Sequence, residues 1–179
     1  MSIHQADWIW PDADPDAKDA FAYLRREIAL APDVVSLRIQ VTASNRYRLY
    51  VDGEPAGIGP CPGALSHSYY DEMQRPVPRD LAGGRICLSA VAYCVGEKTA
   101  MVTDQNQGPA GFRCAIALVA ADGRETWIRT DPDWKGILAP TAPVDRFRLD
   151  ESRVSRWGGY RQVFLAGQEP AGWQHPGFD

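Results

Sequence analysis

The sequence predicts an all-β protein, an antiparallel β-sandwich of the jelly-roll type. Two observations lead to this fold class. Apolar residues alternate with polar ones in several short segments, and Asp-Gly pairs stand between such segments, where a chain turns back on itself. Fourteen prolines and sixteen glycines divide much of the remaining chain into short pieces. We therefore expect about seven to nine short strands, joined by loops of uneven length.

The first apolar segment is open to two interpretations. Residues 16–26 match a short helix, because Phe21 and Leu24 stand three positions apart. Residues 24–30 match the first strand of a sheet equally well. Both alternatives stay open at this stage.

The next segment, 35–43, is predicted to be a half-buried strand. Its apolar residues occupy every second position, with Ser36, Arg38, Gln40 and Thr42 between them. Because successive side chains of a strand point to opposite faces, one face is expected to be buried and the other solvated. The residues expected on the buried face are Val35, Leu37, Ile39, Val41 and Ala43.

A β-hairpin is predicted to follow. Tyr47, Leu49 and Val51 form the apolar face of its first strand. Asp52-Gly53 then supplies the two residue types that best tolerate the positive φ angles of a tight turn. The chain returns through the glycine-containing segment that ends at Pro60.

Three further strands complete the prediction. Residues 86–95 are apolar on both faces, which is typical of a central strand covered on each side. Residues 112–130 predict a second hairpin with its turn at Asp122-Gly123, and the last strand is expected at 160–166. The inner face of the second hairpin carries Phe112, Cys114, Ile116 and Leu118. Over the whole sandwich we expect the inner faces to include Leu37, Ile39, Val41, Leu49, Val51, Leu88, Ala90, Ile116 and Leu118.

Size and composition narrow the class of protein. A chain of 179 residues suits one domain, and its formal net charge of −4 argues against a nucleic-acid partner. No apolar run approaches the roughly 18 residues of a membrane helix, and no signal-peptide pattern opens the chain. We expect no membrane partner and a cytoplasmic location. The cysteines lack C-x-x-C spacing, so we expect buried free thiols rather than zinc ligands or a disulfide at Cys61, Cys87, Cys94 and Cys114.

A series of short motifs runs along nearly the whole chain. In order they are W-I-W at 8–10, L-R-R-E-I at 24–28, Y-R-L-Y-V-D-G at 47–53, A-G-I-G-P at 56–60, Y-Y-D at 69–71, L-A-G-G-R-I at 81–86, T-D at 130–131, W-K at 134–135 and the closing segment 172–179. Their order resembles the N-terminal β-sandwich domain of bacterial α-L-rhamnosidases and related glycoside hydrolases. In two places the chain departs from that pattern, since Asp52 and Arg85 stand where the family usually has Asn. Asp serves the turn as Asn does, but a ligand role of that Asn is not carried over.

The resemblance implies a galactose-binding-domain-like accessory domain over residues 1–166. Residues 167–179 form a tail that resembles the junction to a following domain. The resemblance implies two partners. One is the catalytic domain of the same parent protein, and the other is carbohydrate, which includes rhamnose-containing carbohydrate. The alternative is a stand-alone carbohydrate-binding module, with or without calcium.

No catalytic residue is expected in this chain. A glycosidase needs two carboxyl groups facing each other across a sugar cleft, one of them with a raised pKa. In the related rhamnosidases these groups lie in a separate helical barrel, for which this chain has no sequence. The histidines are isolated, and neither G-x-S-x-G nor H-E-x-x-H occurs.

No cofactor is expected, although a structural calcium ion is left open. Asp12, Asp14 and Asp16 have the alternating spacing that begins a calcium loop. Ala17 and Tyr23 stand where an EF-hand needs Gly and Glu, so a solvated acidic turn is the preferred interpretation. The metal site, if there is one, is unknown from the sequence.

With catalysis not expected, carbohydrate recognition is the function for which the sequence offers candidate binding residues. Sugars are typically bound by an aromatic ring with nearby amide, carboxylate and guanidinium groups, and sandwich domains place such groups in loops. The candidate binding residues are Tyr70, Asp104, Asn106, Arg113 and Trp157. For the tryptophans Trp8, Trp10, Trp127 and Trp134 we expect packing in the core or at an interface.

Overall fold

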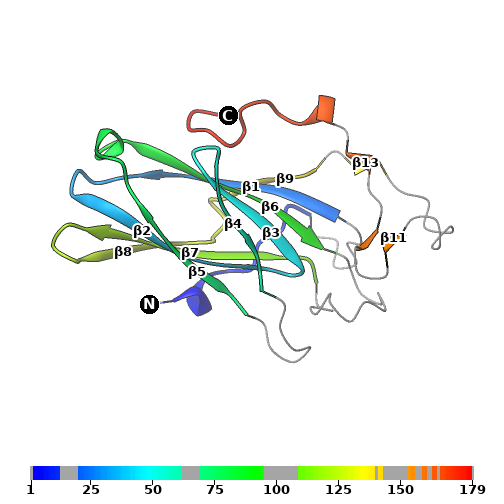
Figure 1. Cartoon of the computed structure of the whole chain (residues 1–179), viewed down its shortest axis with the longest axis horizontal. Helices are drawn as coiled ribbons and strands as arrows, with labels where there is room; N and C mark the ends of the chain where they lie inside the picture. The colour runs from blue at the N-terminus through cyan, green and yellow to red at the C-terminus, as the bar shows by residue number, and fades with distance from the viewer. Residues whose placement is uncertain are drawn as a thin grey trace.

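The structure is a computed structural model in which two antiparallel sheets face each other across one core (Figure 1). It describes residues 2–12, 20–61, 69–94, 109–139, 141–142, 153–155, 159–160, 163–164 and 166–178. The predicted all-β sandwich is therefore confirmed. Within these ranges, no helix has the length and apolar character needed to cross a membrane.

The first sheet has five strands in the order β4-β3-β6-β1-β9. Their bounds are Glu54–Gly59, Arg46–Val51, Arg85–Cys94, Ala20–Ala29 and Lys135–Leu138. β6 lies between β3 and β1 and is buried on both faces, as predicted for a central strand. β1 settles the first open alternative in favour of a strand, because it pairs with β6 along its whole length.

The second sheet has four strands in the order β5-β2-β7-β8. Their bounds are Asp71–Pro76, Val34–Ala43, Phe112–Ala120 and Glu125–Arg129. Both predicted hairpins are present: β3 turns into β4 with φ angles of 50° at Asp52 and 80° at Gly53, and β7 turns into β8 with φ of 85° at Gly123. Aspartate and glycine tolerate these angles, so local chemistry determines both turns.

The core lies between the sheets and contains the residues predicted for the inner faces. All are buried except Val51, which packs against the core from a partly buried position. Phe112 is also fully buried there, with its ring centroid 5.7 Å from that of Trp134.

The prediction for Val35 is wrong. Its side chain is 48% exposed, whereas that of Val34 is 6% exposed and belongs to the core. The pairing of β2 with β7 is irregular between Val34 and Ser36. An irregularity of this kind interrupts the strict alternation of faces, and Val34 thereby takes the inner position.

One expectation falls partly outside the described residues and another needs correction. Of the strand expected at 160–166, the structure describes as strand β12 (Gly159–Tyr160) and β13 (Val163–Phe164), which pair with β11 (Arg153–Ser155) and β10 (Thr141–Ala142) respectively, while residues 161–162 and 165 lie outside the described residues. All four cysteines are thiols, as predicted, but Cys61 is exposed because it follows edge strand β4 outside the core.

The two ends of the described chain lie on opposite outer faces of the sandwich. In Figure 1 the N-terminal end lies beside the four-stranded sheet and the C-terminal segment lies above the five-stranded sheet. Short 3₁₀ turns occur in both, η1 (Ile3–Gln5) and η3 (Ala166–Gln168), and a third, η2 (Arg79–Leu81), precedes β6. These terminal segments build the two surfaces described next.

Candidate functional site

The N-terminal segment is fastened across the outer face of the four-stranded sheet. Ile3 is buried there, and its backbone N–H donates to Oε1 of Gln40 at 2.9 Å. Further along, the N–H of Asp7 donates to the carbonyl of Thr130 at 3.0 Å, and the Thr130 hydroxyl donates back to the carbonyl of Asp7. The segment therefore has a defined path over β2 and the end of β8.

Arg113, a predicted binding residue, lies on β7 and binds the backbone of this segment. Its Nε donates to the carbonyl of Ala6 at 2.6 Å and its Nη2 to the carbonyl of His4 at 3.1 Å. The guanidinium lies 5.6 Å from the ring centroid of Trp8, close enough for a cation–π contact. Arg113 is therefore a positioning residue that orients Trp8 and His4.

Tyr70, the second predicted residue within the described ranges, lies at the same place. Its ring meets that of His4 edge to face, with centroids 5.9 Å apart. Tyr70 is 40% exposed and its neighbour Tyr69 is 50% exposed, while the Tyr69 carbonyl accepts a hydrogen bond from Thr42. The structure thus brings Tyr70 and Arg113 together through His4.

These residues form what we call the aromatic patch: His4, Trp8, Tyr69 and Tyr70, supported by Arg113. Trp8 is 44% exposed and therefore lies outside the core, while the alternative expectation of packing at an interface stays a prediction. One face of the ring lies so close to Gly111 that a Cβ there would be 2.7 Å from Cε3 of Trp8. Gly111 therefore leaves room for the ring, which also has the Arg113 guanidinium over it.

Of the other predicted residues, Asp104, Asn106 and Trp157 lie outside the described residues, and their roles stay predictions. Sequence reasoning missed His4 and Tyr69. The Y-Y-D motif was the available signal for Tyr69, and His4 offered none, because its contact with Tyr70 joins positions 66 residues apart.

The aspartates of two motifs have structural roles. Asp71 of Y-Y-D accepts from the hydroxyl of Tyr47 at 2.5 Å, which links β5 of one sheet to β3 of the other. Burial, followed by this hydrogen bond, raises the pKa of Tyr47 far above its ordinary range, so the phenol stays protonated. Asp52 accepts from the backbone N–H of Cys87 at 2.6 Å, a bond that the side-chain oxygen of an asparagine makes equally well.

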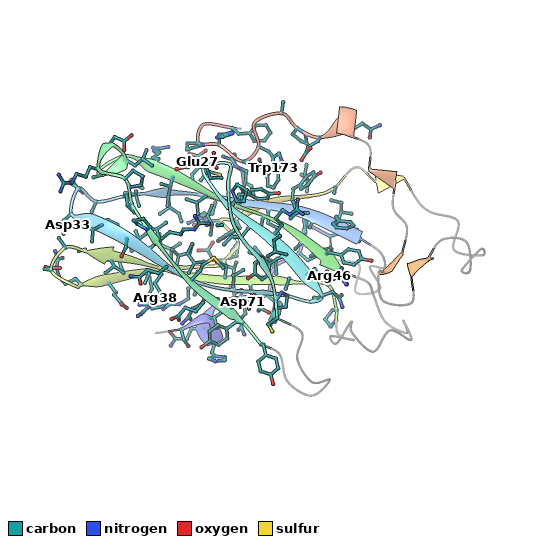
Figure 2. The ribbon with its side chains drawn as sticks, in the orientation of Figure 1. Glu27, Asp33, Arg38, Arg46, Asp71 and Trp173 are labelled. Atoms are coloured by element: carbon teal, nitrogen blue, oxygen red, sulfur yellow. The ribbon has the colours of Figure 1, made fainter. Side chains whose placement is uncertain are left out.

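The C-terminal segment covers the outer face of the five-stranded sheet. Trp173 is buried and stacks on Tyr23, with ring centroids 4.6 Å apart, and its edge meets the ring of Tyr50. Its indole N–H donates to Glu169 at 3.1 Å. In Figure 2, Trp173 and Glu27 lie under this segment at the top of the view.

Arg25 fastens the end of the same segment. Its side chain is 7% exposed and donates to the carbonyls of His175 and Phe178 and to Glu27. Glu27 also accepts the backbone N–H of Gly177 at 2.8 Å. That amide, followed by the Arg25 guanidinium, holds the pKa of Glu27 below its ordinary value, so the carboxylate is ionised at neutral pH.

An open pocket of about 440 Å³ lies beside these contacts. We call it the C-terminal pocket; its charged and aromatic lining consists of Arg25, Arg26, Glu27, Asp133, Lys135 and Phe178. Both carboxylates are paired, Glu27 with Arg25 at 2.8 Å and Asp133 with Arg26 at 3.0 Å. A glycosidase acid needs a raised pKa, and the lowered pKa of Glu27 is the opposite. This pocket is suited to binding rather than to proton donation.

In the part of the chain that the structure describes, no three His, Cys, Asp or Glu side chains lie close enough together to hold a metal ion. Asp14 and Asp16 lie outside that part, so the calcium question stays a prediction.

Comparison with known proteins finds an α-L-rhamnosidase among the sequence relatives of the chain. The chain is 27% identical over 176 residues to an α-L-rhamnosidase of Streptomyces avermitilis, covering 96% of this chain and 16% of that protein. It is thus homologous to α-L-rhamnosidases and spans less than a fifth of the length of the relative it matches. No protein-family model matches the chain.

Solved structures support the fold. A GH78 family rhamnosidase of Bacillus sp. GL1 superposes with a TM-score of 0.73 at 23% identity, covering 98% of this chain and 17% of the other. A lectin from Pleurotus ostreatus, solved in complex with GalNAc, superposes with a TM-score of 0.56 at 22% identity, covering 97% of this chain and 45% of the lectin. At these identities the likeness establishes the β-sandwich and nothing finer.

Proposed function

We propose that this chain, a homologue of a small part of the α-L-rhamnosidases, is a non-catalytic accessory domain of such a glycoside hydrolase. In this proposal it packs beside the catalytic domain of the parent protein and contacts carbohydrate through the aromatic patch. The observation that carries the proposal is the alignment itself, which includes nearly the whole chain but only 16% of the relative. A rhamnosidase therefore contains much more protein than this sandwich.

The aromatic patch supports the carbohydrate contact. Trp8 and Tyr70 present partly exposed rings, and such rings bind the apolar C–H face of a sugar. Arg113 and His4 restrain these rings before any ligand arrives, which lowers the entropy lost on binding. The phenol groups of Tyr69 and Tyr70 can exchange hydrogen bonds with sugar hydroxyls.

A second candidate function is a stand-alone carbohydrate-binding module. The superposition with the Pleurotus ostreatus lectin favours it, because that protein was solved with a bound sugar. The two functions differ in what the isolated chain does. A stand-alone module binds sugar fully by itself, whereas an accessory domain binds weakly until a catalytic domain completes the contact.

The isolated chain is expected to show no hydrolysis of aryl α-L-rhamnosides. The two carboxylates of the C-terminal pocket are both paired with guanidinium groups, so neither is suited to act as a general acid. The measurement is release of nitrophenol from p-nitrophenyl α-L-rhamnoside. Turnover that persists after removal of trace contaminants would contradict the non-catalytic proposal.

Tyr70→Ala is expected to weaken binding of L-rhamnose by about 1–3 kcal/mol, by analogy with other aromatic stacking platforms. The melting temperature should hardly change, because this ring is partly exposed and outside the core. Titration followed by NMR chemical shifts measures the affinity. Trp127→Ala is the matched control, since its ring also lies against an arginine, Arg38, on the same sheet but outside the patch. Equal affinities of the wild type and Tyr70→Ala for L-rhamnose would contradict the proposal that the aromatic patch binds carbohydrate.

A further inference from the structure

Strand β9 ends the five-stranded sheet with an edge that no other described strand covers. All its residues are exposed, and two of them are large and apolar, Ile137 at 49% and Leu138 at 44%. The backbone groups of an exposed apolar edge can pair with a strand of another molecule, and proteins usually protect such edges. This edge is therefore a candidate surface for association.

The other three edge strands of the two sheets carry such protection. β4 contains Pro55, its pairing with β3 is irregular, and Arg75 of β5 donates to the carbonyl of Pro55 at 2.6 Å, which joins these two edges across the sandwich. β8 carries the charged residues Glu125 and Arg129, which are bonded to Arg38 and Gln5. In β9 the only charged residue stands at the first position, and a glycine and two apolar residues follow it.

The hydrogen bonds of the sheet show which backbone groups of β9 point outward. The N–H of Ala139 donates to the carbonyl of Phe21 at 2.8 Å, and the register of β9 with β1, continued by one residue, pairs these two positions. Partners in an antiparallel pair alternate between bonded and non-bonded positions. Gly136 and Leu138 therefore turn their N–H and C=O groups away from β1, toward the open edge.

These outward groups complement a second copy of themselves in one register. When Ile137 stands opposite Ile137 of an antiparallel copy, each Gly136 pairs with the other copy's Leu138, and both residues form all their edge hydrogen bonds. An axis at Leu138 would place Pro140, which has no N–H, opposite Gly136. An axis at Gly136 would place Trp134 opposite Leu138, but the Trp134 N–H is already bonded within its own turn.

The side chains suit the same register. The two Ile137 side chains meet at a non-bonded pair, where cross-strand side chains come closest. Leu138 faces Gly136 of the other copy, so a large side chain lies opposite a residue that has none. Lys135 comes opposite Ala139, so no like charges face each other.

From this arrangement we propose that the chain forms a symmetric dimer in which the β9 strands of two copies pair and join their five-stranded sheets into one continuous sheet. The contact is short, so we expect a weak dimer with a dissociation constant on the order of 100 µM. The proposal goes beyond the accessory function and does not depend on it.

The test is sedimentation equilibrium of the whole chain from about 10 µM to about 1 mM, concentrations on either side of the expected dissociation constant. A reducing agent is present, because Cys61 is exposed and could link copies covalently. The mean mass should rise from 19.8 kDa toward twice that value. Over the same range the backbone N–H groups of Gly136 and Leu138 should exchange with solvent more slowly. A monomer throughout, or a dimer without slower exchange at these two amides, would overturn the proposal.

Variants test the register. Ile137→Lys places two like charges opposite each other at the axis and should weaken the dimer at least about tenfold. Ile58→Lys is the matched control, because Ile58 is a 74% exposed apolar residue on β4, at the far edge of the same sheet. It should leave the dimer unchanged, and both variants should melt like the wild type, since both side chains are exposed.

A mixture of Ile137→Lys and Ile137→Glu should dimerise again, because opposite charges then meet at the axis. A mixture that stays monomeric would contradict the register, and equal losses in Ile137→Lys and Ile58→Lys would contradict the β9 edge as the interface.

Discussion

Replacing Arg25 by methionine is expected to release the C-terminal segment from the five-stranded sheet. Methionine keeps most of the length but loses the guanidinium, which bonds the carbonyls of His175 and Phe178 and the carboxylate of Glu27. The two carbonyls would lose this partner while Glu27 would keep the Gly177 N–H, and a buried polar group left without its partner costs more than the bond itself contributes. The stacking of Trp173 and the hydrogen bond from Gly177 to Glu27 would then have to hold the segment in place.

Cys87 reports the release. Its thiol is fully buried, 3.6 Å from Nη2 of Arg25, and burial raises its pKa, so it is doubly protected from thiol reagents. In Arg25→Met its rate of reaction with Ellman's reagent should rise about tenfold or more, because local opening becomes easier. The measurement uses a Cys61→Ser background, since Cys61 is exposed and would react first.

Two controls accompany this measurement. Arg124→Met removes a solvent-exposed arginine in the same way and should leave the rate unchanged. The reaction should consume one thiol, because Cys94 and Cys114 remain in the folded sandwich. An unchanged rate in Arg25→Met would show that Arg25 does not hold the segment, and reaction of all three thiols would indicate global unfolding instead.

Phe112→Ala is expected to lower the free energy of unfolding by about 3–5 kcal/mol, the usual cost of removing a fully buried aromatic side chain. Phe112 packs on Trp134, and its backbone exchanges both hydrogen bonds of a bridge with Ile9. The cavity would therefore open at the junction of the core with the N-terminal segment.

Urea denaturation measures the effect. Val35→Ala serves as the control, because Val35 is an apolar residue of the same four-stranded sheet with an exposed side chain. This substitution should change the free energy of unfolding by no more than about 0.5 kcal/mol. A loss below about 1 kcal/mol in Phe112→Ala would contradict the position of this ring in a close-packed core.

Much of the sandwich could be predicted because its signals are local. Alternation placed Leu37, Ile39 and Val41 on the inner face, and each is buried. Asp52 and Gly53 adopt positive φ angles for reasons contained within those two residues. Where the prediction failed, at Val35, the cause lies in the pairing of β2 with β7, which is irregular between Val34 and Ser36.

The candidate site could be predicted only in part. Tyr70 and Arg113 were chosen as polar or aromatic groups at strand ends, and the structure places them on one patch through His4. They are connected because the N-terminal segment crosses the sheet between them. No sequence pattern in residues 2–9 predicts that crossing. Arg113 contacts the carbonyl of Ala6 and the ring of Trp8, and its role as a sugar ligand stays a prediction.

The sequence by itself determined the strands, their turns and the faces that form the core, because alternation and turn chemistry act between residues close in the chain. Only the tertiary structure decided what covers the outer faces and which side chains meet there. Arg25 finds the carbonyl of Phe178 across 153 positions, and Arg113 finds that of His4 across 109. Contacts at such separations depend on the path of the whole chain, so no local pattern can specify them.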